Sequence, residues 1–208
     1  MSKTGRVFAC IVAMLAVMSA CKKEEKESRQ TGQEYNPYTA ESVYGEVQKK
    51  IRDNPKDPDL WFRLADLYDR NGQYADEVEA LKKVVELKPD MGYACFKMGT
   101  AYNRLGQHDE AIETFKKTLR YMPDYAVAYN NMAIAYGKTG KTEDEITALK
   151  KAIKVRPSYA TARYNLGVAY MKTGRRDDAK QEYNELKKID ARLAEALLKE
   201  IENPAKGK

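Results

Sequence analysis

A period of 34 residues constrains the fold of this chain more than any other feature. Three residue types recur at this one interval: the glycines 72, 106, 140 and 174, the tyrosines 68, 102, 136 and 170, and the prolines 55, 89, 123 and 157. A shared period of this size is typical of stacked structural repeats. A single unit cannot bury its apolar face alone, so neighbouring units are expected to stack into one continuous core.

Each period contains the pattern of two helices. In the first period Trp61, Leu64, Ala65 and Tyr68 are spaced three and four apart, which places them on one helix face. The recurring glycine is expected to take a left-handed backbone conformation in the turn between the two helices. The recurring proline lies just past the second helix and is expected to end it.

The residues directly after three of the prolines are expected to cap the next helix, since aspartate and serine side chains can accept hydrogen bonds from the first helical N–H groups. These residues are Asp90, Asp124 and Ser158. The second helices are expected to face inward with pairs of residues three apart: Leu81 and Val84, Phe115 and Thr118, Leu149 and Ala152, and Tyr183 and Leu186.

These features resemble the tetratricopeptide repeat (TPR) family, whose unit has 34 residues and forms a helix-turn-helix. The units span residues 58–91, 92–125, 126–159 and 160–193. The family places a large residue at position 4, leucine at 7, a small residue at 8 and tyrosine at 11. The four units hold Trp61, Leu64, Ala65 and Tyr68; Cys95, Met98, Gly99 and Tyr102; Tyr129, Met132, Ala133 and Tyr136; and Arg163, Leu166, Gly167 and Tyr170.

Arg163 departs from this pattern, whereas Trp61 is expected in the core. The resemblance implies an all-α fold, a right-handed superhelical solenoid of antiparallel helix pairs. Residues 41–57 match a second helix without its first, so we interpret them as an N-terminal half-repeat. Residues 191–208 are interpreted as a C-terminal capping helix and tail of the kind that such stacks need for solubility.

The first 20 residues have the layout of a lipoprotein signal peptide. Lys3 and Arg6 precede an apolar run over residues 7–18, which is too short to span a bilayer comfortably. Residues 18–21 resemble a bacterial lipobox, which implies that Cys21 is lipidated and becomes the first mature residue. Met18 stands where a lipobox usually has leucine, so a plain signal peptide or a short membrane anchor remains an alternative.

Residues 21–40 are predicted to form a disordered tether after the lipidated cysteine. They are dense in charge and nearly free of aliphatic residues, so they cannot bury enough surface to fold. Such a tether reaches about 25 Å. Lys22 follows the cysteine, and the absence of aspartate there favours the periplasmic face of the outer membrane, with a Gram-positive cell surface as the alternative.

No catalytic, metal or cofactor motif stands out in the sequence, so we expect a protein that is not an enzyme and binds no cofactor. His108, the single histidine, is expected in a solvated turn, and Cys95 is expected to be a small buried hydrophobe. The net charge of +6 is spread along the chain without a basic stripe, which argues against nucleic acid as a partner.

Two glutamates stand where the family normally has a small alanine, as at Ala111 and Ala179. Glu145 lies three residues after Thr142, so this pair is interpreted as a capping box. Glu77 has no such neighbour and is expected to be half-exposed and hydrogen-bonded.

In the TPR family the first helices line a concave groove that binds partners. The residues that map onto this groove are Phe62, Arg63, Asp66, Tyr93, Phe96, Lys97, Thr100, Asn130, Asn131, Ile134, Tyr164, Asn165 and Val168. Asn131 and Asn165 are the strongest candidates, because an amide can both donate to and accept from a peptide backbone. A structural or merely solvated role for these asparagines remains an alternative. The family's lysine and asparagine clamp for a C-terminal carboxylate has no match here.

The sequence therefore predicts a protein-binding adaptor of the cell envelope, which takes a partner protein or extended peptide in its groove and is held at the membrane through Cys21. The alternative is a self-associating structural lipoprotein that forms a homodimer. Pilotins and outer-membrane assembly factors include TPR lipoproteins of similar layout, but nothing in the sequence selects these roles.

Overall fold

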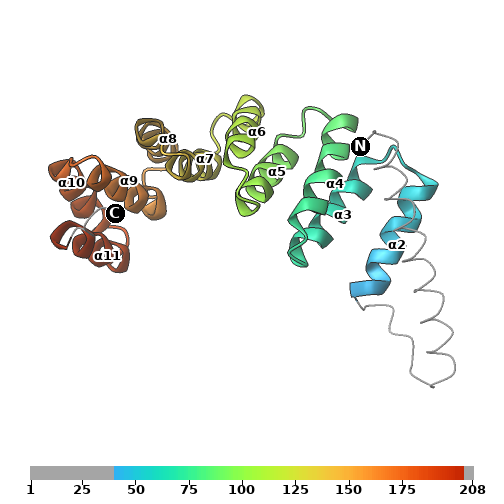
Figure 1. Cartoon of the computed structure of the whole chain (residues 1–208), viewed down its shortest axis with the longest axis horizontal. Coiled ribbons are helices and arrows are strands. Elements are labelled where there is room, and N and C mark those ends of the chain that lie inside the picture. The colour runs from blue at the N-terminus through green and yellow to red at the C-terminus, as the bar shows by residue number, and fades with distance from the viewer. Residues whose placement is uncertain (1–39, 204–208) are drawn as a thin grey trace, which may run out of the picture. The chain divides into compact units, whose positions relative to one another are not determined.

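The fold is an all-α stack of helix pairs. The computed structural model describes residues 40–203, and in this range it contains helices and no strands. Figure 1 shows the helices in chain order. They are α2 (Ala40–Asp53), α3 (Pro58–Arg70), α4 (Tyr74–Leu87), α5 (Gly92–Arg104), α6 (His108–Tyr121), α7 (Ala126–Lys138), α8 (Thr142–Val155), α9 (Ala160–Lys172), α10 (Arg176–Leu186) and α11 (Ala191–Glu202).

Helices α3 to α10 form four antiparallel pairs, and each pair packs on the next. Each helix from α3 to α10 contacts its successor in the chain, and α11 also contacts α9. Among the described residues, those from Val47 onward form one compact unit, and the first residues of α2 lie outside it. The predicted class, a TPR-like helical solenoid, is confirmed. The predicted signal peptide, Cys21 and most of the tether lie outside the described residues.

The turns between paired helices adopt the predicted backbone. Gly72, Gly106, Gly140 and Gly174 have φ angles of 71°, 75°, 75° and 74°, whereas no other described residue has a positive φ. A residue with a Cβ would be strained in this left-handed conformation. The recurring glycines are therefore required by the turn that reverses the chain inside each pair.

The predicted helix caps are wrong for three units. Helices α5, α7 and α9 follow Met91, Tyr125 and Tyr159, and none of these residues makes a side-chain capping bond. The tyrosines instead pack against the hydrophobic core. Two of these cap positions thus serve apolar packing, and among helices α3 to α11 aspartate caps occur only at Asp57 and Asp190.

The core consists of the inward faces of both helices in each pair. The inward pairs predicted for α4, α6 and α8 are all buried, and on α10 Leu186 is buried while Tyr183 is half-buried. Cys95 is fully buried, as predicted, and burial raises the pKa of its thiol. The thiol therefore acts as a small packing group and not as a reactive one.

Trp61 and Arg163, at position 4 of the first and fourth units, make the same kind of polar contact with the preceding turn. Trp61 is half-buried, less than predicted, and its Nε1 donates to the carbonyl oxygen of Pro55 at 2.9 Å. Arg163 donates from Nε to the carbonyl oxygen of Pro157 at 3.0 Å and pairs with Glu182 at 2.9 Å. The arginine thus replaces an aromatic ring without losing the bond that holds the preceding turn.

The glycine at position 8 of the second unit, Gly99, is required because a large side chain packs against it. A Cβ on Gly99 would lie 2.8 Å from the ring of Phe115, which is fully buried. We expect Gly99→Ala to lower the free energy of unfolding by about 1–2 kcal/mol, because the overlap outweighs the better helix propensity of alanine. Urea denaturation measures this change.

A second substitution tests the cause of this loss. The third unit holds Ala133 and Leu149 at the corresponding positions. Adding Phe115→Leu to Gly99→Ala is therefore expected to cost less than the sum of the two single changes. Strictly additive losses would show that the ring does not restrict position 99.

Candidate partner-binding groove

The predicted groove residues lie on the first helices of the pairs, α3, α5, α7 and α9, but they differ in exposure. Tyr93 is the most open of the aromatic groove residues, with 47% of its surface exposed. Arg63 is exposed, while Phe62, Phe96, Asn131, Tyr164 and Asn165 are half-buried. Asn130 is only 3% exposed and the side chain of Lys97 only 14%, so these two residues do not present free groove surface as predicted.

Four aromatic rings form a continuous row from α3 to the start of α7. The ring centroids of Phe62 and Tyr93 are 6.1 Å apart, and those of Tyr93 and Phe96 are 5.9 Å apart. Phe96 meets Tyr125 edge-on at 4.8 Å. Such contacts stabilise each ring's position beyond simple burial. The first two units therefore contribute a preformed aromatic surface.

The three predicted asparagines form a chain of amide contacts between α7 and α9. Asn165 donates from Nδ2 to Oδ1 of Asn130 at 3.0 Å, and Asn130 donates from Nδ2 to Oδ1 of Asn131 at 3.4 Å. Asn130 is buried because its side chain lies between the other two. The structure thus brings the asparagines together, and their role in binding a partner stays a prediction.

A hollow of ≈ 320 Å³ lies beside these asparagines, and we call it the α7–α9 hollow. It combines a small aliphatic and aromatic surface with several charged groups, so it is more polar than most ligand pockets. The lining residues are Ile134, Gly137, Lys138, Glu145, Tyr164, Asn165, Val168, Lys172 and Glu200.

Sequence reasoning placed Ile134, Tyr164, Asn165 and Val168 in the groove and missed the charged residues of the hollow. Lys138 and Lys172 stand four residues after Ile134 and Val168, on the same helix face, so they could have been found. Glu200 comes from the capping helix α11, and the repeat pattern carries no signal for it.

Glu145 lines the α7–α9 hollow and does not belong to a capping box. Helix α8 begins at Thr142 after Lys141, without a side-chain cap, and Glu145 is only 6% exposed. Its carboxylate oxygens lie 3.2 and 3.1 Å from Nζ of Lys172. A Cβ on Gly137 would lie 2.8 Å from this carboxylate, so the glycine makes room for it.

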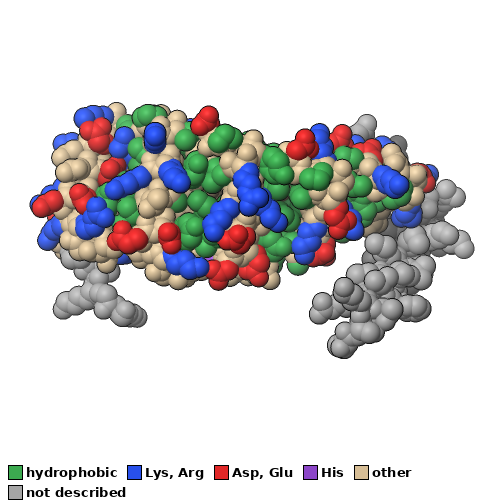
Figure 2. All heavy atoms as spheres, turned by 90° about the horizontal axis from the view of Figure 1, so that it is seen from above, with side chains coloured by type: hydrophobic (Ala, Val, Ile, Leu, Met, Phe, Trp, Pro, Cys, Tyr) green, Lys and Arg blue, Asp and Glu red, His purple; other side chains and the backbone are tan. Residues whose placement is uncertain are grey.

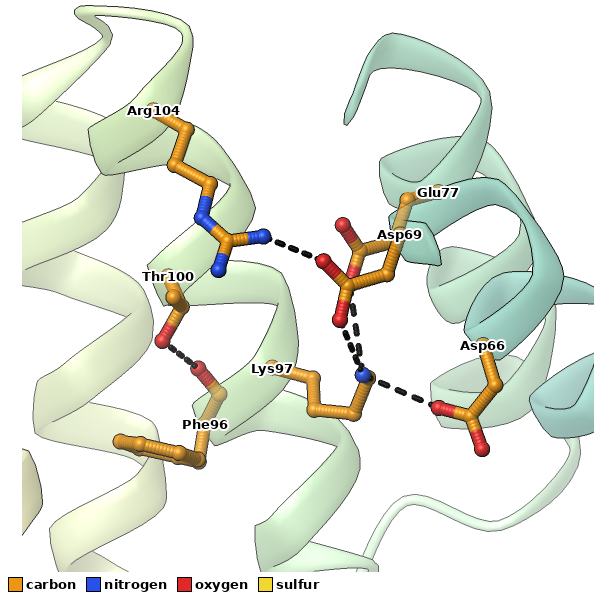
Figure 3. A network of polar contacts seen from close by, with 7 residues as sticks. All are labelled: Asp66, Asp69, Glu77, Phe96, Lys97, Thr100 and Arg104. Atoms are coloured by element: carbon orange, nitrogen blue, oxygen red, sulfur yellow. Dashed lines mark hydrogen bonds and ion pairs between the residues drawn. The ribbon is translucent and has the colours of Figure 1, made fainter. Parts of the chain in front are cut away.

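Glu77 occupies the corresponding place in the first unit, and the prediction for it is also wrong. The residue is 2% exposed and not half-exposed, and its Oε2 has no hydrogen-bond partner in the described residues. The inward face of α4 carries it toward Asp69 and Lys97 (Figure 3). Burial, followed by the charge of Asp69, raises its pKa to about 7.

The charges on the surface are of mixed sign. Figure 2 shows one face, on which lysine and arginine side chains lie among acidic ones with hydrophobic side chains between them. No group of histidine, cysteine and acidic residues in residues 40–203 could hold a metal ion. His108 is the first residue of α6 and not part of the turn as predicted; its Nδ1 lies 3.1 Å from Oδ1 of Asn103.

The helix pairs, the left-handed glycine turns and the groove on the first helices define a helical repeat protein. Three models of the tetratricopeptide repeat family match the chain, over residues 93–158, 146–201 and 48–79. These matches show that residues 48–79 and 93–201 contain tetratricopeptide repeats.

Several solved structures share this fold. The crystal structure of MamA has 23% sequence identity and a TM-score of 0.71, over 81% of this chain and 95% of that chain. MamA from residue 41 onward, from Desulfovibrio magneticus RS-1, has 20% identity and a TM-score of 0.65, over 86% and 96%. YrrB, described as a TPR protein with an unusual peptide-binding site, has 19% identity and a TM-score of 0.62, over 76% and 84%.

These similarities are similarities of fold. No curated protein matches the chain in sequence. None of the helices within residues 40–203 has both the length and the apolar character needed to cross a bilayer.

The pair of Glu145 and Lys172 offers a test of the hollow's stability. Replacing Lys172 by methionine leaves a carboxylate buried without its counter-charge, so we expect the free energy of unfolding to fall by about 1–3 kcal/mol. Thermal or urea denaturation at neutral pH measures this loss. The double variant Glu145→Ala/Lys172→Met should recover most of it, since alanine is the residue found at this position in the second and fourth units. A double variant as unstable as Lys172→Met would contradict this explanation.

Proposed function

We propose that this chain is a protein-binding adaptor that holds an extended segment of a partner along its first helices. The observation that carries the proposal is the α7–α9 hollow, where Tyr164, Asn165 and two aliphatic side chains line one cavity. A cavity with an apolar wall and a few polar groups can take one side chain of a partner and fix its orientation.

The amides beside the hollow suit a peptide backbone. Nδ2 of Asn131 and Oδ1 of Asn165 have no partner within the described residues, so one donor and one acceptor are free for a ligand. Such a pair can bind main-chain groups whatever the side chains are. The peptide-binding site named for YrrB, which has a similar fold, supports a peptide as the ligand.

The wall of the hollow favours an apolar side chain on the partner. Ile134 is 40% exposed although it is a large hydrophobic residue, and Val168 lines the same cavity from α9. Removing such surface from water is favourable in proportion to its area. Lys138 lies at the same cavity with no ion pair in the described residues, so it can also attract an acidic group next to the apolar one.

A capture experiment tests the hollow directly. With full-length protein as bait in crosslinked envelopes, Ile134→Asp is expected to reduce recovery of specific partners about ten-fold or more, because it places a charge against the apolar anchor. The matched control is Ile189→Asp, since Ile189 is exposed to a similar extent, 38%, and lies outside the hollow. Equal recovery with both variants would exclude the hollow as the binding site, and self-crosslinks alone would favour the homodimer.

The place of action that we propose is the cell envelope, with the chain exported and anchored through lipid on Cys21. The support is in the sequence: the short apolar run over residues 7–18, the lipobox-like residues 18–21 and the polar stretch after them. Acyl chains contribute about 0.8 kcal/mol of binding for each buried methylene group, so several chains hold firmly. Lys22 favours the outer membrane over the inner membrane.

Metabolic labelling with a fatty acid checks the anchor. We expect the parent protein to incorporate label and to remain in the membrane fraction, and Cys21→Ser to lose both properties. Cys95→Ser is the control, since that thiol is fully buried in the stack. Label on the Cys21→Ser variant, or membrane retention equal to the parent, would contradict the anchor.

A further inference from the structure

A cluster of five charged side chains joins the first repeat unit to the second (Figure 3). Asp66 and Asp69 come from α3, Glu77 from α4, and Lys97 and Arg104 from α5. Nζ of Lys97 lies 2.9 Å from Oδ1 of Asp66 and 3.0 Å from Oδ2 of Asp69, and Arg104 pairs with Asp69. Three carboxylates therefore share two cations at this junction.

Glu77 is the one member of the cluster without adequate hydrogen bonds. Its Oε1 is 3.7 Å from Nζ of Lys97, beyond hydrogen-bond distance, and its Oε2 has no partner in the described part of the chain. Leaving an ionised carboxylate buried without donors is costly. A protonated carboxyl avoids that cost and adds an O–H donor among the neighbouring carboxylate oxygens.

The other charges at the junction favour the protonated form as well. When Glu77 is neutral, Asp66 and Asp69 balance Lys97 and Arg104, and when it ionises the cluster carries one uncompensated negative charge. Burial is the main cause that raises the pKa of Glu77 to about 7, and Asp69 adds to it against the opposing effect of the two cations. Of the nearby residues on α4 itself, Tyr74 lies against Arg104, and Asp76 is exposed and bonded to Gln73.

The equivalent glutamate of the third unit, Glu145, has different hydrogen-bond partners. Both oxygens of Glu145 lie within hydrogen-bond distance of Lys172. No cation serves Glu77 in this way, since Lys97 is turned toward the two aspartates. The two glutamates therefore differ in their hydrogen-bond partners and not in burial, because both are nearly inaccessible to solvent.

We propose that Glu77 is a proton-linked lock between the first and second repeat units: it carries a proton in the closed junction, and its ionisation weakens that junction. The pKa of Glu77 in the folded chain, about 7, lies above the ordinary value of 4.5. The stabilisation is therefore complete below about pH 4.5 and is lost as the pH rises toward 7. A modest change around neutral pH thus alters the coupling of α4 to α5.

Two measurements on the full chain test the proposal. The side-chain carboxyl carbon of Glu77, followed by NMR, is expected to titrate near pH 7. The unfolding equilibrium constant of the parent is expected to rise roughly 50- to 100-fold more between pH 5 and pH 8 than that of Glu77→Gln, which mimics the neutral side chain. A titration near pH 4.5, or the same pH dependence in both proteins, would overturn the lock.

Control variants separate this effect from a general loss of stability. Glu145→Gln removes the matched carboxylate of the third unit and should keep the full pH dependence of the parent. If Glu77→Gln fails to fold, Glu77→Ala replaces it, because alanine stands at this position in the second and fourth units. Glu77→Ala should show the same weakened pH dependence, and a dependence equal to that of the parent would again overturn the proposal.

Discussion

The stack depends on close packing between a small residue on each first helix and a large side chain opposite it. A Cβ on Gly167 would lie 2.4 Å from Leu197 of the capping helix, and a Cβ on Gly99 would lie 2.8 Å from the buried ring of Phe115. The absence of these Cβ atoms lets the apolar faces of neighbouring helices meet closely, where dispersion and hydrophobic burial act together. The same contacts fix where each first helix lies, and so they fix the groove that those helices line.

Two units place a glutamate where close packing would favour alanine, and the consequences reach the groove. A lysine of the next unit lies near each of them: Lys97 is 3.7 Å from Glu77 but is held by Asp66 and Asp69, whereas Lys172 bonds to Glu145 directly. Charged groups at an interface between repeats add little stability compared with apolar packing, but they make the junction depend on charge. The first and third junctions thus differ in chemistry from the second, where Asn103 donates to the backbone oxygen of Asn131.

The period of 34 residues was sufficient to predict the helix pairs, the glycine turns and most of the core, because these follow from backbone conformation and from which helix face is apolar. It could not predict which individual polar residues are buried or which partners they contact. Asn130 and Lys97 occupy groove positions but are buried by contacts with the neighbouring unit. Glu77 and Glu145 were misjudged for the same reason, since their partners come from residues 20 to 27 positions away.

The two ends of the groove present different chemical groups, and this difference determines which ligands suit it. The first two units offer aromatic rings already stacked on one another, with Lys97 held by aspartates. The last two offer an open hollow, where one amide donor, one amide acceptor and Lys138 have no partner within residues 40–203. A partner that spans both ends therefore has to satisfy backbone and side-chain groups near α9 and to contact mainly ring surface near α5. A single extended segment can meet these different demands along its length, whereas a compact ligand would use one end only.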